Sequence, residues 1–508
     1  MRRFLIYTLS LLTLTLLLGA CKRETIVLYG ISVESLKHCT YAEQDVTITF
    51  KLQQPPQQDP EQEPVVNNII PIVTTDADWV SVTTTTSESV TLHVLANEGN
   101  KRSAKITIAA SGYKSTTVTL SQFRTPPAEA NHTLMYYFLG NSLNRYFKIN
   151  LKDASTAIEK GILGNSNRVV FFRQESASRG YIGELCFDGG ACLEQRLAEI
   201  EIPNSVVTYD FVGQCIAEMA NYAPAKRYGI VCAGHGQAWI PREVLNNDSD
   251  IAKASLGYTP WQKAPGAEVT RAYGETSARI DIPELALAIE DSGVSLDYII
   301  FDACFMSNIE VLYDLRNVAN YIIASPCEIM GDGFPYDMTL PYLFTDNGNT
   351  TDYVRAAESY HIYYRDVYNN SARSGSITLI DCAEIEALAE ATKRVVATAT
   401  DDYDPSKLQT YEGEQVHHFY DFGQWVRTIA TDSEALEAFN TQYEKCVIET
   451  YTLNSFYTAY GSYGSRPIDL DAYSGITTSA PSEAYPNAWR KTNWYKDVWP
   501  TEANEVDE

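Results

Sequence analysis

The sequence predicts a multidomain protein: an all-β sandwich followed by an α/β/α domain with a mostly parallel central sheet. Three observations predict this fold class. The chain has 508 residues, too many for a single core. Residues 24–123 contain short β-branched segments with alternating polarity, which is typical of antiparallel strands. From residue 131 to 500, apolar strands alternate with helical patterns, which is typical of a sheet covered on both faces.

The N-terminus carries an export signal. Arg2 and Arg3 precede an apolar run from Phe4 to Leu18, which is too short for a stable membrane span. The ending Leu-Gly-Ala-Cys resembles a bacterial lipobox, which implies cleavage before Cys21 and a lipid on its thiol. Residues 1–21 are therefore predicted to comprise a signal peptide and the lipobox cysteine, and the lipid on Cys21 is predicted to anchor the protein to a membrane of the bacterial cell envelope. A plain secretory signal is the alternative.

The charge and the cysteines narrow the function class. The formal net charge is -26, which argues against nucleic acid as a partner because phosphates need a basic face. Ten cysteines are present without a tight CxxC pair, so neither a zinc array nor a dense disulfide framework is expected. Nine remain after Cys21, and an odd number leaves at least one free thiol. Cys186 and Cys192 flank a turn-like stretch and are candidates for a local bridge.

The β-rich region has its own sequence markers. A polar insert from Gln53 to Asn68 interrupts the strands and is expected to be an exposed loop. The stretch from residue 76 to 122 resembles a BACON domain, an immunoglobulin-like module, through Trp79, Asn97, Arg102 and the closing Val-Thr-Leu-Ser-Gln. The family name implies glycans as partners, but a spacer role is favoured. Trp79 is expected in the core of the sandwich rather than on a sugar-binding surface.

The second region begins after a Pro-containing linker, residues 123–131. Its expected strands are 133–139, 168–172, 228–233, 298–301, 321–324 and 377–380. Helical patterns lie between most of them, for example over 205–223 and 282–293. In parallel sheets of this kind, ligands bind at the carboxyl ends of the strands. The residues that directly follow each strand are therefore the candidates for a functional site.

Two strands end in reactive side chains. Gly-His235-Gly236 follows one strand, and Asp302-Ala-Cys304 ends another. If the strands are neighbours, the imidazole and the thiol emerge at one sheet edge, where His235 promotes the thiolate form of Cys304. The N–H groups of Gly236 and Cys304 are then expected to hold an oxyanion. The alternative is that Cys304 is a small buried hydrophobic residue.

These segments resemble the clostripain family of clan CD cysteine peptidases. The resemblance covers roughly residues 130–500 and is most specific in the His segment and in "FDACFMSNIEVLYDLRNVANYIIASPCEIMGDGFPY". It implies a caspase-like fold, with His235 as catalytic base or acid and Cys304 as nucleophile. It also implies that Asp302 lies in the primary substrate pocket and favours Arg or Lys before the cleaved bond. As an alternative, Asp302 caps a following helix.

Family members are often activated by self-cleavage between the His and Cys segments. Residues 246–279 form a long stretch there, and its basic residues Lys253, Lys263 and Arg271 are possible cleavage sites. A simple insertion loop is the alternative. Calcium dependence also occurs in the family, but the sequence contains no DxDxDG-type loop. No metal site is assigned for that reason.

The sequence therefore predicts an exported, lipid-anchored cysteine endopeptidase that cleaves proteins or peptides after exposed Arg or Lys. The alternative is a non-catalytic surface lipoprotein that binds protein or glycan on the same fold. The intact His235–Cys304 pair favours the enzyme. The acidic Asp302 speaks against a preference for acidic side chains because like charges repel.

Overall fold

The computed structural model divides the chain into two compact units, Met1–Thr125 and Pro126–Glu508. It describes residues 28–33, 38–39, 43–53, 69–99, 102–122, 129–164, 166–188, 191–246, 261, 263–271, 278–460, 464–480 and 484–499. The predicted signal peptide with Cys21, most of the predicted loop before residue 69, and Lys253 lie outside the described residues. Each unit is described by itself.

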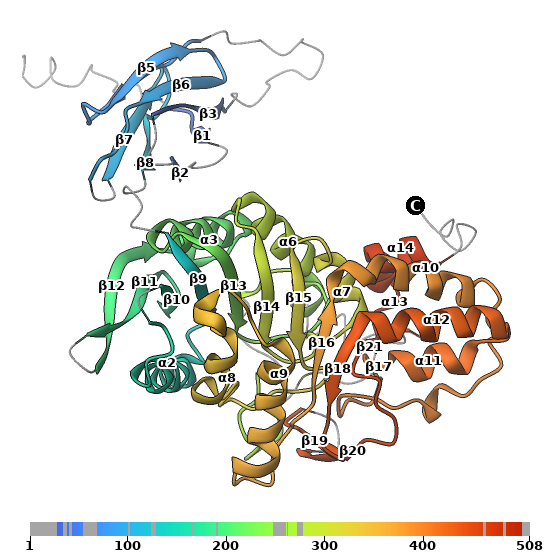
Figure 1. Cartoon of the computed structure of the whole chain (residues 1–508). Helices are drawn as coiled ribbons and strands as arrows, with labels where there is room; N and C mark the ends of the chain where they lie inside the picture. The colour runs from blue at the N-terminus through green and yellow to red at the C-terminus, as the bar shows by residue number, and fades with distance from the viewer. Residues whose placement is uncertain are drawn as a thin grey trace, which may run out of the picture. The chain divides into compact units, whose positions relative to one another are not determined.

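The first unit consists of two four-stranded sheets (Figure 1). The first sheet has the order β1 (Ile31–Val33), β3 (Gln44–Leu52), β6 (Ser89–Val94) and β5 (Val80–Thr85). The second has the order β2 (His38–Cys39), β8 (Thr116–Gln122), β7 (Arg102–Ala109) and β4 (Ile72–Thr75). Alternate residues of these strands are buried between the sheets, as in β6 and β8. The predicted all-β sandwich is confirmed.

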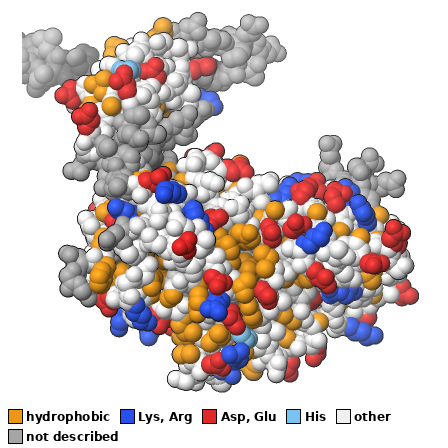
Figure 2. Space-filling view, viewed as in Figure 1, with side chains coloured by type: hydrophobic (Ala, Val, Ile, Leu, Met, Phe, Trp, Pro, Cys, Tyr) orange, Lys and Arg blue, Asp and Glu red, His pale blue; other side chains and the backbone are white. Residues whose placement is uncertain are grey.

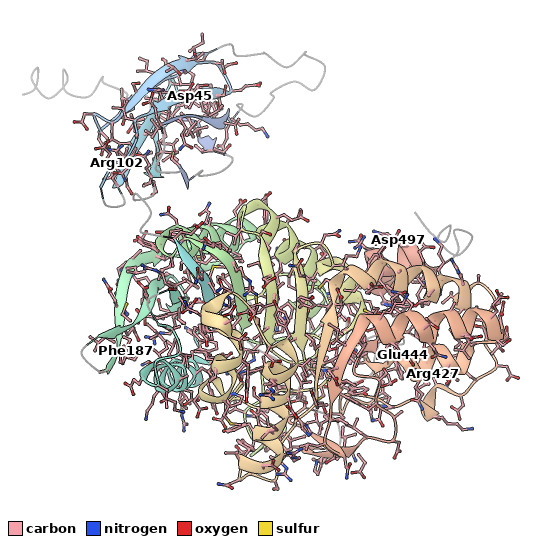
Figure 3. The ribbon with its side chains drawn as sticks, viewed as in Figure 1. Asp45, Arg102, Phe187, Arg427, Glu444 and Asp497 are labelled. Carbon is pink, nitrogen blue, oxygen red and sulfur yellow. The ribbon has the colours of Figure 1, made fainter. Side chains whose placement is uncertain are left out.

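Trp79 belongs to the core of this sandwich, as predicted. Its side chain is 9% exposed, and the guanidinium of Arg102 lies 4.4 Å from the ring centroid. Arg102, labelled in Figure 3, donates to Gln122 Oε1 at 2.8 Å and to the carbonyl of Leu95 at 2.8 Å. The cation therefore covers one ring face and leaves that face closed to a sugar.

The second unit is built on a nine-stranded sheet with the order β12-β11-β10-β9-β13-β14-β15-β16-β18. The strands are β9 (Ala130–Phe138), β10 (Asn167–Ser176), β11 (Arg179–Asp188), β12 (Ala191–Glu201), β13 (Ala225–Ala233), β14 (Leu296–Asp302), β15 (Ala319–Ala324), β16 (Ile377–Asp381) and β18 (Val447–Tyr451). The five central strands are parallel. The outer strands are antiparallel, so the sheet is mixed, with a parallel centre.

Helices cover both faces of this sheet (Figure 1). One face carries α2 (Asn144–Glu159), α8 (Tyr336–Leu343) and α9 (Tyr353–Ile362), which pack on each other. The other carries α3 (Tyr209–Tyr222), α6 (Ile282–Asp291) and α7 (Ile309–Leu315). Because both faces are covered, β9 and β14 are buried along nearly their whole length.

Smaller elements complete the unit beyond β16. They are α10 (Ile385–Val396), α11 (Phe422–Ile429), α12 (Ser433–Cys446), α13 (Pro486–Trp489), α14 (Asn493–Val498), β17 (Tyr420–Asp421), β19 (Ser455–Thr458), β20 (Arg466–Asp469) and β21 (Thr477–Thr478). A short α4 (Arg242–Asn246) follows β13. Among the described helices, none combines the length and hydrophobicity that crossing a bilayer requires.

The candidate bridge between Cys186 and Cys192 is not formed. Both thiols are free and lie at the end of the β11–β12 hairpin, near the labelled Phe187 (Figure 3). Cys186 pairs with Leu193, and Phe187 pairs with Cys192. Since successive side chains of a strand point to opposite faces, this register places the two thiols on opposite faces of the hairpin.

The surface of the second unit agrees with the acidic composition. Over the described residues of the face that Figure 2 shows, basic side chains are scattered among acidic ones. That face therefore offers no continuous basic strip of the kind that binds a phosphate backbone.

Candidate active site

The predicted His and Cys segments meet at one edge of the sheet. β13 and β14 are parallel neighbours, and Ala233 pairs with Asp302 in their register. His235 and Cys304 each follow two residues later. The Gly234 N–H donates to the Asp302 carbonyl at 3.3 Å and ties the two strand ends together. The predicted adjacency of the two segments is thus confirmed.

Gly236 brings the His segment directly against the Cys segment. A Cβ at this position would lie 2.3 Å from the carbonyl oxygen of Cys304 and 3.0 Å from its nitrogen. Any larger residue would push the two backbones apart. The missing side chain therefore allows the N–H groups of residues 236 and 304 to point at the same place.

Both N–H groups converge on one carbonyl oxygen, that of Arg271. The Gly236 N–H donates to it at 2.9 Å, and the Cys304 N–H donates to it at 3.3 Å. These are the two donors that the sequence predicted for an oxyanion. Two backbone donors on one carbonyl oxygen is the geometry that stabilises negative charge developing there.

The side chain of Arg271 is completely buried, and its guanidinium uses all of its donors. Nη1 contacts Asp302 Oδ2 at 2.9 Å and donates to the Asp302 carbonyl at 3.1 Å. Nη2 donates to Asn150 Oδ1 at 2.8 Å and to the Gly331 carbonyl at 3.0 Å. Nε donates to the same Gly331 carbonyl at 3.2 Å. The Phe147 ring centroid lies 5.7 Å from the guanidinium carbon.

Asp302 lies against the buried guanidinium of Arg271 and caps no helix. Besides Arg271, Tyr336 donates its hydroxyl to Asp302 Oδ2 at 2.7 Å. α7 begins only at Ile309, and its N-cap is Asn308, which accepts from the Val311 N–H. The alternative role of Asp302 as a helix cap is therefore wrong. Burial raises the pKa of Asp302, while the Arg271 cation and the Tyr336 hydroxyl oppose this rise.

The segment that carries Arg271 lies against the chain like an added β-strand. The Arg271 N–H donates to the Ile329 carbonyl at 2.9 Å, and the Gly331 N–H donates to the Val269 carbonyl at 2.6 Å. The residues between them form an antiparallel bridge. An extended peptide that pairs with a free strand edge is a common mode of peptide recognition.

The thiol of Cys304 is sealed in this state. Its side chain is fully buried, and Sγ accepts a hydrogen bond from the Ile329 N–H at 3.0 Å. Burial raises the pKa of Cys304 well above its usual value, and the nearby Glu328 carboxylate raises it further. The thiol is therefore protonated while the segment is in place.

The imidazole of His235 is neutral in the same state. Burial lowers its pKa to about 3, and the cations of Arg271 and Arg279 add to this effect. Nε2 lies 3.1 Å from the hydroxyl oxygen of Ser142, and Nδ1 is buried without a hydrogen-bond partner in the described structure. Between the described side chains of His235 and Cys304 there is no hydrogen bond. The Arg271 cation thus also lowers the basicity of His235, the residue predicted as catalytic base.

The structure separates the basic residues that were proposed as cleavage sites. Arg271 is buried against Asp302, whereas Lys263 is exposed and forms a backbone bridge with Tyr460.

Sequence reasoning missed Asn150 and the Gly331 carbonyl. Asn150 is a polar residue on the buried stripe of α2, next to Leu151, and that placement was a readable signal. Among the described residues, no group of three His, Cys, Asp or Glu side chains could hold a metal ion.

Comparisons with known structures find cysteine proteases of similar fold. A secreted C11 cysteine protease from Bacteroides thetaiotaomicron, called iotapain, has 27% identity and a TM-score of 0.63, over 73% of this chain and 100% of its own. An inactive zymogen C11 protease from Parabacteroides distasonis has 28% identity and a TM-score of 0.60, over 74% of this chain and 99% of its own.

A third similar structure is a complex with a peptide inhibitor. The structure of a secreted C11 protease from Bacteroides thetaiotaomicron with an irreversible peptide inhibitor has 26% identity and a TM-score of 0.60, over 73% of this chain and 99% of its own. No curated protein matches the chain. Residues 69–123 match the family model of the BACON domain, described as a candidate N-terminal binding domain. Residues 197–466 match the model of the clostripain family, and the chain therefore belongs to this family of cysteine peptidases.

Proposed function

We propose that the protein is an endopeptidase that cleaves after arginine, with Cys304 as nucleophile and His235 as base and acid. One observation carries this proposal: Arg271 occupies the site as the residue before a cleaved bond would. Its carbonyl oxygen accepts from the N–H groups of Gly236 and Cys304, and its guanidinium contacts Asp302. A substrate arginine would place the same groups at the same partners.

The reaction follows from these positions. His235 takes the thiol proton, and the Cys304 thiolate attacks the carbonyl carbon of the arginine. The carbonyl oxygen becomes negative and is held by the two N–H groups. The C–N bond breaks, and His235 gives its proton to the leaving amine. A water molecule, activated by His235, then hydrolyses the thioester and restores the thiol.

The pocket favours arginine over lysine. The guanidinium of Arg271 has five N–H donors, and each one faces an oxygen of Asp302, Asn150 or Gly331. A lysine ammonium has three donors and no planar fork, so at least one buried oxygen would lose its partner. Among the basic residues expected from the sequence, arginine is therefore the preferred one.

The same geometry supports self-activation at one bond. The bond proposed for cleavage is Arg271–Ala272, because the Arg271 carbonyl oxygen accepts from the Gly236 and Cys304 N–H groups. A related protease has been solved as an inactive zymogen. The described chain represents such a precursor, and cleavage after Arg271 is the step that opens the site. Lys253 and Lys263 are not needed for that step.

Export and anchoring complete the proposal. Two related structures are described as secreted proteases, and residues 1–21 have the features of an export signal ending in Cys21. We propose that the lipid on Cys21 holds the enzyme on the cell envelope and that the β-sandwich acts as a spacer. The buried Trp79 supports the spacer role.

The test uses the chain from residue 22, made alongside Cys304→Ala and Arg271→Ala. Denaturing gels, intact mass and N-terminal sequencing follow self-cleavage, and fluorogenic peptides ending in Arg, Lys, Asn or Leu follow turnover. The parent is expected to expose Ala272 as a new N-terminus and to cleave after Arg. Both variants are expected to remain intact. Folded parent protein that cleaves neither itself nor any peptide would contradict the proposal and favour a binding protein.

A further inference from the structure

A second carboxylate lies beside the docked segment, on the side opposite Asp302. Glu328 is fully buried and directly precedes the residues that pair with the segment. Its Oε2 accepts a hydrogen bond from the hydroxyl of Thr270 at 2.6 Å. Thr270 is the residue immediately before Arg271 and is 2% exposed. The site therefore contacts two successive side chains of the docked peptide through two different acids.

Strand geometry explains this division. Successive side chains of an extended segment point to opposite sides. The Arg271 side chain enters the pocket of Asp302, and the Thr270 side chain points to Glu328. Any peptide that docks in this register presents its own residue before the arginine to the same carboxylate. In such a peptide, that side chain is as enclosed as the arginine.

Glu328 is held in place by residues outside the docked segment. The Thr458 hydroxyl contacts Oε1, and the Ala459 N–H lies 3.2 Å from Oε1 and 3.1 Å from Oε2. Both partners lie at the end of β19. The carboxylate thus keeps its position when the segment leaves, and Oε2 then faces the space that the Thr270 hydroxyl had filled.

We propose that Glu328 selects the residue before the cleaved arginine and that it favours threonine or serine there. The inference rests on the proposed function because it takes the docked segment as a model of a bound substrate. The preferred substrates are proteins and peptides with Thr-Arg or Ser-Arg at the cleaved bond.

The preference follows from hydrogen bonding in a closed site. Valine has nearly the shape of threonine but offers no donor, so Oε2 of the buried carboxylate loses its hydroxyl donor and keeps only the Ala459 N–H. An acidic residue would bring a second negative charge into the same space. Burial also raises the pKa of Glu328 to about 7, and the hydrogen bonds from Thr270 and Thr458 oppose this rise. Loss of the Thr270 donor therefore makes the carboxylate still harder to keep charged.

The first test uses the precursor as its own substrate. Thr270→Val and Thr270→Ser are made by cell-free synthesis, and cleavage after Arg271 is followed over time on gels. Thr270→Val is expected to slow cleavage about tenfold or more, the usual effect of losing a hydrogen bond to a charged group, and Thr270→Ser is expected to stay near the parent rate. Equal rates for Thr270→Val and the parent would overturn the inference.

The second test compares matched peptides on the cleaved enzyme. A peptide ending in Val-Thr-Arg and one ending in Thr-Val-Arg have the same composition, and kcat/KM is expected to be about tenfold higher for the first. In Glu328→Gln this ratio is expected to fall to about threefold or less, because the amide group accepts fewer hydrogen bonds. A merely structural role would lower both values and leave the ratio unchanged, which would contradict the inference.

The two levels of the proposal fail differently. If both peptides are cleaved after Arg at the same rate, the role of Glu328 is wrong and the proposed endopeptidase stands. If no arginine peptide is cleaved and the precursor stays whole, the endopeptidase itself is wrong, and the preference built on it is wrong too.

Discussion

An arginine side chain packs on an aromatic ring in each unit of the molecule, Arg102 on Trp79 and Arg271 near Phe147, and the two arginines differ in what holds them. Arg102 covers the Trp79 ring and begins β7, which pairs along its length with β8. Arg271 is fully buried and belongs to a segment that forms an isolated antiparallel bridge with Met330, outside the strands of the sheet. In addition, the carbonyl oxygen of Arg271 is held by two N–H groups. The side-chain contacts are alike in kind, whereas the backbone contacts distinguish the two arginines.

The largest effect is expected for Asp302→Asn, which removes the charge that faces a bound arginine. Breaking a buried ion pair by removing one partner costs about 3–5 kcal/mol, so kcat/KM for arginine peptides should fall by roughly two to four powers of ten. Peptide kinetics on protein cleaved beforehand in trans provide the measurement. Unchanged kinetics after Arg would show that Asp302 serves the fold and not the substrate.

The second effect is a loss of stability of the precursor in acid. Burial lowers the pKa of His132 and of His235 to about 3. Between pH 6.5 and 3 the unfolded chain binds more protons than the folded one, so stability rises with pH and falls as pH drops below 6.5. The expected loss is roughly 1 kcal/mol per pH unit for each histidine.

Thermal unfolding of Cys304→Ala, which stays uncleaved, measures this loss across that pH range. His235→Gln in the same background should flatten the histidine contribution to the slope by about a third, since burial also lowers the pKa of His418, to about 4, and one of three groups is gone. A slope that is unchanged by this substitution would mean that His235 is not buried and neutral in the precursor.

A smaller effect is expected for Asn150→Ala, which removes one acceptor of the guanidinium. A hydrogen bond to a charged group is worth about 1.5–3 kcal/mol, so arginine peptides should be cleaved at least about tenfold more slowly. Lysine peptides should change little, because the shorter donor set of lysine depends less on this oxygen. The ratio of the two kcat/KM values is the readout, and a constant ratio would speak against the role of Asn150.

The smallest effect is expected for Arg102→Ala in the first unit. It removes a cation–π contact and hydrogen bonds to Gln122 and Leu95, worth about 1–2 kcal/mol together. The melting of the isolated or attached sandwich should shift down, while cleavage after arginine stays at the parent rate. A loss of peptidase activity would show that Arg102 does more than support its own core.

Much of this arrangement was predictable from local sequence. The strands before His235 and Cys304 are apolar runs with abrupt ends, and neighbouring parallel strands align their ends, so adjacent strands bring the two segments to one edge of the sheet. The antiparallel direction of β16 was not predictable because a buried strand has the same composition in either direction. The predicted bridge between Cys186 and Cys192 does not form because the register of the β11–β12 hairpin places the two thiols on opposite faces. Local sequence does not give this register, which depends on the pairing of the strands in the sheet.

The site was predictable only in part. Three basic residues of one stretch looked equivalent, and only the tertiary structure places Arg271 against Asp302. Asn150 stands out in the sequence as a polar residue on the buried stripe of α2. Glu328 lies within the segment that resembles the clostripain family, but nothing local marks it as a neighbour of a substrate. The proposed catalytic residues, His235 and Cys304, thus follow strand ends that can be recognised in the sequence. The residues proposed to select the substrate come together only in the tertiary structure.

The burial of Cys304 affects how readily its thiol is oxidised. A thiolate is the form that oxidants and other disulfides attack, and this thiol is both protonated and out of contact with solvent. Eight other described cysteines are also unpaired, so a reactive sulfur would have many wrong partners. The segment that carries Arg271 thus shields the sulfur from oxidants, and on the proposed activation the same cleavage that opens the site would also expose Cys304 to oxidation.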